Sequence, residues 1–216
     1  MVRRKDPSIP SADPALGAAT YAVFRRELRD SGCVRCALAA GRTRIVVDRG
    51  EPSARILVVG EAPGAEEDRQ GLAFVGRSGR LLDGMLQEAG LDPARDILIA
   101  NVVKCRPPGN RPPKAGEART CMPYLRRQME LVAPRVLILL GATAVKHILP
   151  HLPAKGLTGR TGRFFASPEV PGVDILITFH PAYILRNPRR RPLMVSHLAL
   201  ATGRLAELVR EGIPLN

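Results

Sequence analysis

The stretch Ile56-Leu-Val-Val-Gly-Glu-Ala-Pro-Gly64 decides the fold of this chain, because a continuous aliphatic run ends abruptly in an acidic, glycine-containing loop. An aliphatic run without polar alternation is typical of a strand buried on both faces of a sheet. Three further runs have the same character: Ile97-Leu-Ile-Ala-Asn101, Val136-Leu-Ile-Leu-Leu140 and Ile175-Leu-Ile-Thr178. These four runs predict the core strands of one sheet.

Helical patterns separate the four runs. Apolar residues recur on one helical face between residues 81 and 89, and again between residues 118 and 132, where we expect Pro123 to kink or split the helix. Two more helices are expected near residues 15–30 and 194–211. Strands that alternate with helices indicate a parallel sheet covered on both sides. The sequence therefore predicts an α/β fold, a three-layer α/β/α sandwich around a central four-stranded, mostly parallel sheet.

The length of 216 residues fits one domain. We expect residues 1–14, rich in Arg, Lys, Pro, Ser and Asp, to form a loose N-terminal tail, and residues 15–216 to form a single domain. No apolar run approaches the roughly 20 residues that cross a membrane. No signal peptide or oligomerisation motif is recognisable, so we expect a cytoplasmic, nucleoid-associated monomer without a membrane partner.

The charge balance favours a polyanionic partner. The chain has 33 basic and 20 acidic residues, which gives a formal net charge of +13. Phosphates bound by such a surface release counterions, so nucleic acid is the leading candidate. An arginine-rich proteome would produce the same charge without a nucleic-acid function. Clustering supports the functional interpretation, because Arg186, Arg189 and Arg190 crowd one proline-containing loop.

All four cysteines fall into one pattern: Cys33 and Cys36 form a Cys-x-x-Cys pair, and Cys105 and Cys121 follow separately. Four thiolates form a complete ligand set for zinc or for an iron-sulfur cluster. Two disulfides are disfavoured, because a chain of this length buries its own core and shows no export signal. The spacing alone leaves zinc and an iron-sulfur cluster open.

Three strand-end loops contain residues suited to chemistry, and ligands of parallel sheets bind beyond the carboxyl ends of the strands. Glu61 follows the first strand, and four acids in its loop argue against a phosphate-binding role. Asn101 ends the second strand; its amide matches the O4 and N3–H edge of uracil and mismatches cytosine, although strand-end Asn is often only a turn former. His180 follows the fourth strand and precedes the basic loop.

Together these motifs resemble the family 4 uracil-DNA glycosylases, the iron-sulfur, thermophile-type group of the uracil-DNA glycosylase superfamily. The resemblance covers the chain from about Ala15 to Leu208. It rests on Gly-Glu-Ala-Pro-Gly, Phe74-Val-Gly, Asn-Val-Val-Lys-Cys-Arg-Pro-Pro, Leu140-Gly-Ala, His-Pro-Ala-Tyr-Ile-Leu-Arg-Asn-Pro and the cysteine order. It implies that the four cysteines hold one 4Fe-4S cluster embedded in the domain.

The resemblance also implies an activity: excision of uracil from single- or double-stranded DNA in base excision repair. The enzyme would flip the base out of the stack, hydrolyse its N-glycosidic bond and leave an abasic site. Glu61 would position the attacking water, His180 would donate a hydrogen bond to uracil O2, and Asn101 would select uracil. A non-catalytic iron-sulfur module that binds DNA or assists a polymerase is the alternative from another functional class.

The remaining site residues come from the same resemblance. Phe74 would stack on the flipped base, Ala62 would leave room near O2, and Asn110 would support the site. Glu67 would exclude the thymine methyl group, with the adjacent Glu66 and Asp68 as open alternatives.

The loop after His180 would bind the DNA. Either Ile184 or Leu185 would fill the gap that the flipped base leaves in the duplex, and the sequence does not separate the two. Arg186, Arg189 and Arg190 would contact phosphates.

Overall fold

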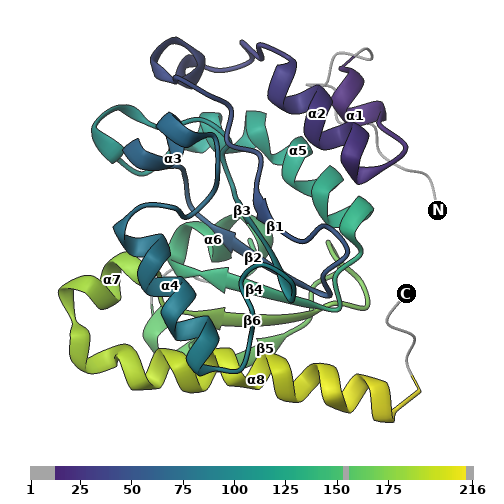
Figure 1. The fold of residues 1–216 in the computed structure, drawn as a ribbon, viewed down its shortest axis with the longest axis vertical. Coiled ribbons are helices and arrows are strands. Elements are labelled where there is room, and N and C mark those ends of the chain that lie inside the picture. Colours follow the sequence, from purple (N-terminus) through teal and green to yellow (C-terminus); the bar gives the residue numbers. More distant parts are fainter. Residues whose placement is uncertain (1–12, 153–155, 213–216) are drawn as a thin grey trace.

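The four aliphatic runs form the centre of a six-stranded sheet in the computed structural model, which describes residues 13–152 and 156–212. The strand order is β1-β3-β2-β4-β6-β5 (Figure 1). The strands are β1 (Arg49–Gly50), β2 (Ile56–Gly60), β3 (Ile97–Asn101), β4 (Val136–Leu140), β5 (Arg163–Phe165) and β6 (Asp174–Thr178). Strand β2 pairs in parallel with β3 and β4, and β4 pairs in parallel with β6.

The expected number of four strands is wrong, because β1 and β5 add one antiparallel strand at each edge. These strands have two and three residues, and none of their residues is fully buried. Such short edge strands lack the aliphatic run that marks a central strand, so the hydrophobic pattern does not reveal them.

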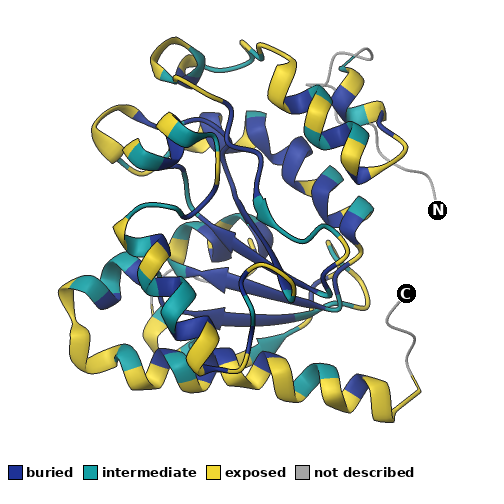
Figure 2. Ribbon diagram, viewed as in Figure 1, coloured by how far each residue is buried: buried dark blue, intermediate teal, exposed yellow. Residues whose placement is uncertain are grey.

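Helices cover both faces of the sheet (Figures 1 and 2). Side chains alternate along each strand: Leu57 and Val59 join one buried cluster, and Ile56 and Val58 join the other. The first cluster packs against α1 (Pro14–Gly17), α2 (Tyr21–Asp30), α5 (Ala115–Val132) and α6 (Gly141–Ile148). The second packs against α4 (Arg77–Glu88), α7 (Pro181–Arg186) and α8 (Arg191–Arg210). The short helix α3 (Ala65–Gln70) follows β2.

Helix α5 is one continuous element through Pro123, so the expected split does not occur. Ten residues of α5 are buried, Pro123 among them, and this packing holds the helix together despite the missing N–H. No helix in the described part of the chain is both long and apolar enough to span a membrane.

Most of the expected N-terminal tail, residues 1–12, lies outside the described residues. Asp13 and Pro14 belong to the folded part: the Asp13 side chain caps α1, and Tyr124 donates a hydrogen bond from its hydroxyl to the Asp13 carboxylate. Residues 13 and 14, which the sequence assigned to the tail, are therefore part of the described fold.

The four parallel strands end at the same edge of the sheet, on the side of α3 and α7 (Figure 1). The loops that follow β2, β3, β4 and β6 meet there, as the parallel arrangement requires.

Candidate active site

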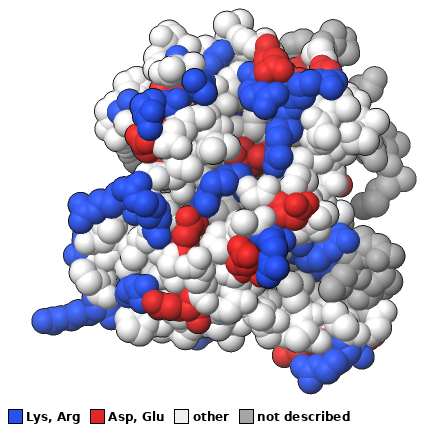
Figure 3. All heavy atoms as spheres, viewed as in Figure 1, with Lys and Arg blue, Asp and Glu red and all other residues white. Residues whose placement is uncertain are grey.

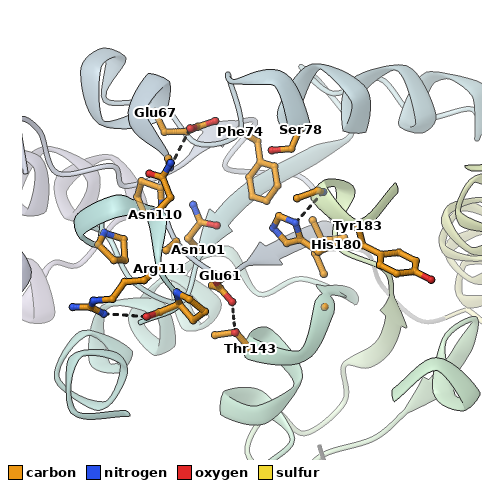
Figure 4. A pocket seen from close by; sticks show the side chains of 18 of the residues that line it. Glu61, Glu67, Phe74, Ser78, Asn101, Asn110, Arg111, Thr143, His180 and Tyr183 are labelled. Atoms are coloured by element: carbon orange, nitrogen blue, oxygen red, sulfur yellow. Dashed lines mark hydrogen bonds between the residues drawn. The ribbon is translucent and has the colours of Figure 1, made fainter. Parts of the chain in front are cut away.

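A cavity of about 500 Å³ opens at this edge, and loops after all four parallel strands line it (Figure 4). All seven residues expected in catalysis and substrate binding line the cavity: Glu61, Ala62, Glu67, Phe74, Asn101, Asn110 and His180. Residues from three separate strand ends therefore meet in one place, as the sequence predicted.

Asn101 is the last residue of β3 and has only 1% of its surface exposed. Its side-chain Oδ1 is buried and has no hydrogen-bond partner among the residues that the structure describes. A buried acceptor without a donor costs about 1–3 kcal/mol, and folded proteins pair nearly all such atoms. Asn101 thus presents an unused acceptor to whatever enters the cavity.

Phe74 lies beside Asn101 and holds a left-handed backbone conformation with φ of 53°. Two glycines make room for it. A Cβ on Gly60 would lie 2.4 Å from Phe74 Cζ and 2.6 Å from Asn101 Oδ1, and a Cβ on Gly79 would lie 1.8 Å from the Phe74 carbonyl oxygen. Glycine is therefore required at positions 60 and 79, because any larger residue there would collide with Phe74 or Asn101.

His180 completes this wall, with its ring centroid 5.8 Å from that of Phe74 (Figure 4). It is the N-cap of α7, and its Nδ1 accepts a hydrogen bond of 3.1 Å from the Ala182 N–H. Burial, assisted by the charge of Arg186, lowers the pKa of His180 to about 4. The imidazole is consequently neutral at pH 7, and since Nδ1 is an acceptor, the ring proton resides on Nε2.

Glu61 follows β2 and is held by Thr143, whose hydroxyl donates a hydrogen bond to Glu61 Oε2 (Figure 4). Thr143 is in the first turn of α6 and also lines the cavity. Thr143 carries no motif of its own in the sequence, yet it is the third residue after β4, and the rule that ligands bind beyond parallel strands points to it.

Glu67 is buried and joins two loops. Its Oε2 accepts a hydrogen bond of 3.1 Å from the Gly64 N–H, and its Oε1 accepts one of 2.7 Å from the Gly76 N–H. The neighbouring acids are engaged elsewhere: Asp68 accepts from the backbone of Thr43, and Glu66 pairs with Arg69. Of the three acids considered for thymine exclusion, only Glu67 lines the cavity.

Asn110 follows β3 at the end of a 3₁₀ turn (Pro108–Asn110), and its Oδ1 accepts a hydrogen bond of 2.7 Å from Arg106 Nε. The next residue, Arg111, also lines the cavity and forms a bidentate pair with Glu117. Arg111 did not emerge from the sequence, because its partner depends on how the loop folds back on α5.

The Uracil DNA glycosylase superfamily profile matches residues 47–201, a range that contains every residue of this cavity described above. The chain belongs to the uracil DNA glycosylase superfamily.

Individual relatives agree with this assignment. The type-4 uracil-DNA glycosylase of Thermotoga maritima is 42% identical over 155 residues, which are 72% of this chain and 79% of the relative. The type-4 uracil-DNA glycosylase of Pyrobaculum aerophilum is 38% identical over 175 residues, 79% of this chain and 88% of the relative. The type-5 uracil-DNA glycosylase of the same organism is 33% identical over 178 residues, 74% of this chain and 72% of the relative.

The residues expected to contact DNA in this superfamily member differ in exposure. Ile184 is only 1% exposed and packs in the core that α4, α7 and α8 share, so it lacks the surface that a wedge needs. Leu185 is half-buried. Arg186, Arg189 and Arg190 are exposed, and Lys and Arg atoms gather along the cavity edge of the molecule (Figure 3). Only Arg186 of these residues also lines the cavity.

The four cysteines line a second, much smaller cavity beside the start of α5. Hydrogen-bond donors face three of the sulfurs: the Lys104 N–H lies 3.3 Å from Cys121 Sγ, Arg42 Nη1 lies 3.6 Å from Cys105 Sγ, and the Tyr124 hydroxyl lies 3.6 Å from Cys33 Sγ. Within the described residues, no group of three or more His, Cys, Asp or Glu side chains is arranged to hold a single metal ion.

Burial raises the pKa of Cys105 to about 11 and that of Cys121 to about 12, so both are neutral thiols at pH 7 in the absence of a bound cation. Four sulfurs around one cavity, with donors directed at them, fit a group that binds through four thiolates.

Proposed function

We propose that this protein is a type-4 uracil-DNA glycosylase that hydrolyses the N-glycosidic bond of uracil in DNA and leaves an abasic site for base excision repair. The unpartnered Oδ1 of Asn101, buried beside the Phe74 ring and the neutral His180, is the observation that carries this proposal. Identity to the type-4 relatives, higher than to the type-5 relative, supports the subtype.

Asn101 selects the base. Its Oδ1 accepts from uracil N3–H, and its amide N–H donates to O4. Cytosine has an acceptor at N3 and a donor at N4. Each of these hydrogen bonds would therefore be replaced by repulsion, between two acceptors at N3 and between two donors at N4. Phe74 stacks on the base without choosing between pyrimidines. Glu67, whose carboxylate is fixed by two backbone N–H groups, excludes the C5 methyl group of thymine.

His180 stabilises the leaving group. As the bond between uracil N1 and the sugar C1′ breaks, its electron pair stays with uracil, and negative charge develops on O2. The Nε2–H of the neutral imidazole donates a hydrogen bond to O2 without transferring its proton, which is the electrostatic role of an oxyanion site. The Nδ1 hydrogen bond from Ala182 fixes the ring orientation that this role needs.

Glu61 completes the hydrolysis. Its carboxylate positions a water molecule that adds to C1′ and stabilises the positive charge on the sugar; the proton lost by that water passes to Glu61 and then to solvent. Thr143 holds one carboxylate oxygen, so the other is free to orient the water.

The same proposal covers DNA binding. Leu185, half-buried on α7, fills the gap in the duplex, and Arg186, Arg189 and Arg190 contact phosphates. Unpairing is cheapest in single strands and mismatches, so uracil in single-stranded DNA and opposite guanine is excised faster than uracil opposite adenine. The enzyme acts as a monomer: the exposed large apolar side chains in the described residues are few and scattered.

We further propose that Cys33, Cys36, Cys105 and Cys121 hold one 4Fe-4S cluster. The four sulfurs line one small cavity, and the sequence resemblance to the iron-sulfur group of the superfamily supports this choice over zinc. Four thiolate ligands leave no open position, so a bound cluster joins distant segments and takes no part in hydrolysis. Iron and acid-labile sulfide analysis of the purified protein tests this assignment, and one zinc per chain without iron would overturn it.

An oligonucleotide panel tests the activity. Uracil, thymine, hypoxanthine and xanthine are each placed in single strands and in duplexes, and abasic sites are detected by alkaline cleavage. We expect cleavage at uracil and not at thymine, with Asn101→Asp reducing the rate. If excess enzyme produced no abasic sites, the protein would instead be a non-catalytic iron-sulfur module that binds DNA.

A further inference from the structure

A second hollow, of about 450 Å³, lies between α5 and α6, outside the active-site cavity. Four cationic or titratable side chains line it: Arg119 and Arg126 from α5, and Lys146 and His147 from α6. No acidic side chain is among the described residues that line it. Of these, Arg126 is partly neutralised by Glu169 at 3.4 Å.

Arg119 and Lys146 are exposed and take part in no ion pair within the described residues. His147 lies close enough to both for their charges to lower its pKa, in addition to the larger effect of its own burial. A cluster of cationic side chains without a neighbouring carboxylate is typical of a surface that binds an anion.

The hollow adjoins the active-site cavity along both of its helices. Helix α6 begins with Gly141 at the cavity, and Lys146 is three residues beyond Thr143, a rise of about 4.5 Å. Helix α5 begins four residues after Arg111, which also lines the cavity, and Arg119 is about 6 Å further along it. A strand that leaves the cavity between Arg111 and Thr143 reaches these cations within a few nucleotides.

We propose that the α5–α6 hollow binds phosphates of single-stranded DNA that flanks the uracil, through Arg119 and Lys146. This inference rests on the proposed glycosylase function and adds a second contact surface to it. The exposed arginines of α7 and the following turn lie on the other side of the cavity, since they belong to the face covered by α4, α7 and α8.

The preference for a single strand follows from the position of the hollow. Nearly all of its lining residues belong to α5 and α6, which pack on one face of the sheet and not at the strand ends that open into the active site, so DNA must turn around these helices to enter it. Duplex DNA has a persistence length of about 50 nm, and bending a short site by 40–90° costs of the order of 1–6 kcal/mol. A single strand follows the turn at little cost.

The double substitution Arg119→Gln with Lys146→Gln tests the proposal. We measure the affinity for uracil-free single strands and duplexes between 50 and 300 mM salt, and the excision kinetics on uracil-containing oligonucleotides. Each phosphate contact contributes about 0.7 to the slope of log affinity against log salt for a single strand. Losing two contacts should therefore reduce the slope by about 1.4 on a long single strand and leave the duplex slope unchanged.

The excision kinetics should show the same dependence on the length of the single strand. KM for uracil in a long single strand should rise with kcat unchanged, while a short oligonucleotide that ends before the hollow should show neither change. The matched control is Arg95→Gln with Arg210→Gln, which removes the same two charges from exposed positions away from the cavity. Arg119→Lys with Lys146→Arg keeps both charges and should retain the wild-type slope.

The outcomes separate the two proposals. If the double variant and the wild type have equal salt slopes on long single strands, or if the control variant loses as much, the hollow does not bind DNA and uracil excision is unaffected. If the wild type forms no abasic sites in the short oligonucleotide, the glycosylase proposal fails whatever the salt slopes show.

Discussion

The active-site cavity and the cysteine cavity lie on either side of one short segment, residues 101–105. The two cavities differ in whether their polar atoms already have hydrogen-bond partners. At the active site, Asn101 Oδ1 is buried without a partner. At the cysteine cavity, backbone and side-chain donors already face the sulfurs. The first region keeps hydrogen-bonding capacity for a ligand, whereas the second uses its capacity internally, which distinguishes a reaction site from a structural one.

Lys104 connects the two regions. It is 1% exposed; its Nζ donates a hydrogen bond of 2.9 Å to the carbonyl oxygen of Asn101 and another to Gln128 Oε1, while its backbone N–H faces Cys121. Gln128 in turn donates to Tyr21 and to the carbonyl oxygen of Val47. A buried network therefore fixes the end of β3 from behind. Substitutions in the two regions should then separate chemistry from stability.

The largest expected effect is on chemistry. His180→Ala removes the donor to uracil O2 and should lower the single-turnover excision rate by about 10²- to 10³-fold. Binding to uracil-free DNA should stay nearly unchanged, because the proposed contact of His180 with DNA is to the flipped base alone. Quenched-flow excision and fluorescence anisotropy measure the two quantities.

His180→Asn is the matched control for this change. Its side-chain oxygen can cap α7 as Nδ1 does in the wild type, so helix stability should recover while the rate stays low. Equal losses of binding and rate in His180→Ala, both recovered in His180→Asn, would make His180 a structural cap only.

The next effect comes from Thr143, which holds the Glu61 carboxylate. A hydrogen bond to a charged group is worth about 1.5–3 kcal/mol, so its loss corresponds to roughly 10- to 100-fold in rate. Thr143→Val should lower kcat within that range, and Thr143→Ser should restore it. A Thr143→Val enzyme with the wild-type kcat would show that Glu61 needs no support from α6.

Lys104→Met should instead act mainly on stability. The substitution leaves Gln128 Oε1 and the Asn101 carbonyl oxygen buried without their donor, at a cost of about 1–3 kcal/mol. For a protein of this size, that cost lowers the melting temperature by roughly 2–12 °C. Differential scanning calorimetry measures the shift, and iron analysis of the same sample should show undiminished iron. Loss of iron in parallel would place Lys104 functionally with the cysteines.

The sequence predicted the four central strands because each is a continuous aliphatic run, and it predicted the site because Glu61, Asn101 and His180 lie at or just beyond the ends of such runs. The edge strands were missed because short, half-exposed strands leave no hydrophobic pattern. Thr143 and the role of Glu67 in joining two loops depend on contacts between separate segments, which no local pattern contains. The same holds for Ile184 and Leu185: only the packing of α7 determines which of them is buried.

The smallest expected effect is that of pH on the rate, and it depends on the low pKa of His180. Burial favours the neutral imidazole and sets the pKa at about 4, below the value of about 6.5 expected in the unfolded chain. His180 is thus neutral throughout the range from pH 8 to pH 5, and its ionisation should leave kcat unchanged there. Below pH 5, protonation of Nδ1 would oppose the Ala182 N–H and turn the ring, so kcat should fall.

The stability of the fold should respond at higher pH than the rate does. Between pH 6.5 and about 4 the unfolded chain binds a proton at His180 and the folded chain does not, so the stability present above pH 6.5 is progressively lost on acidification. Urea denaturation at pH 7.0, 5.5 and 4.5 should show the wild type losing stability relative to His180→Asn. A kcat that titrates near pH 6.5 in the wild type but not in His180→Asn would mean that His180 keeps the pKa of a solvent-exposed imidazole, and the ring would then not be neutral throughout the range from pH 8 to pH 5.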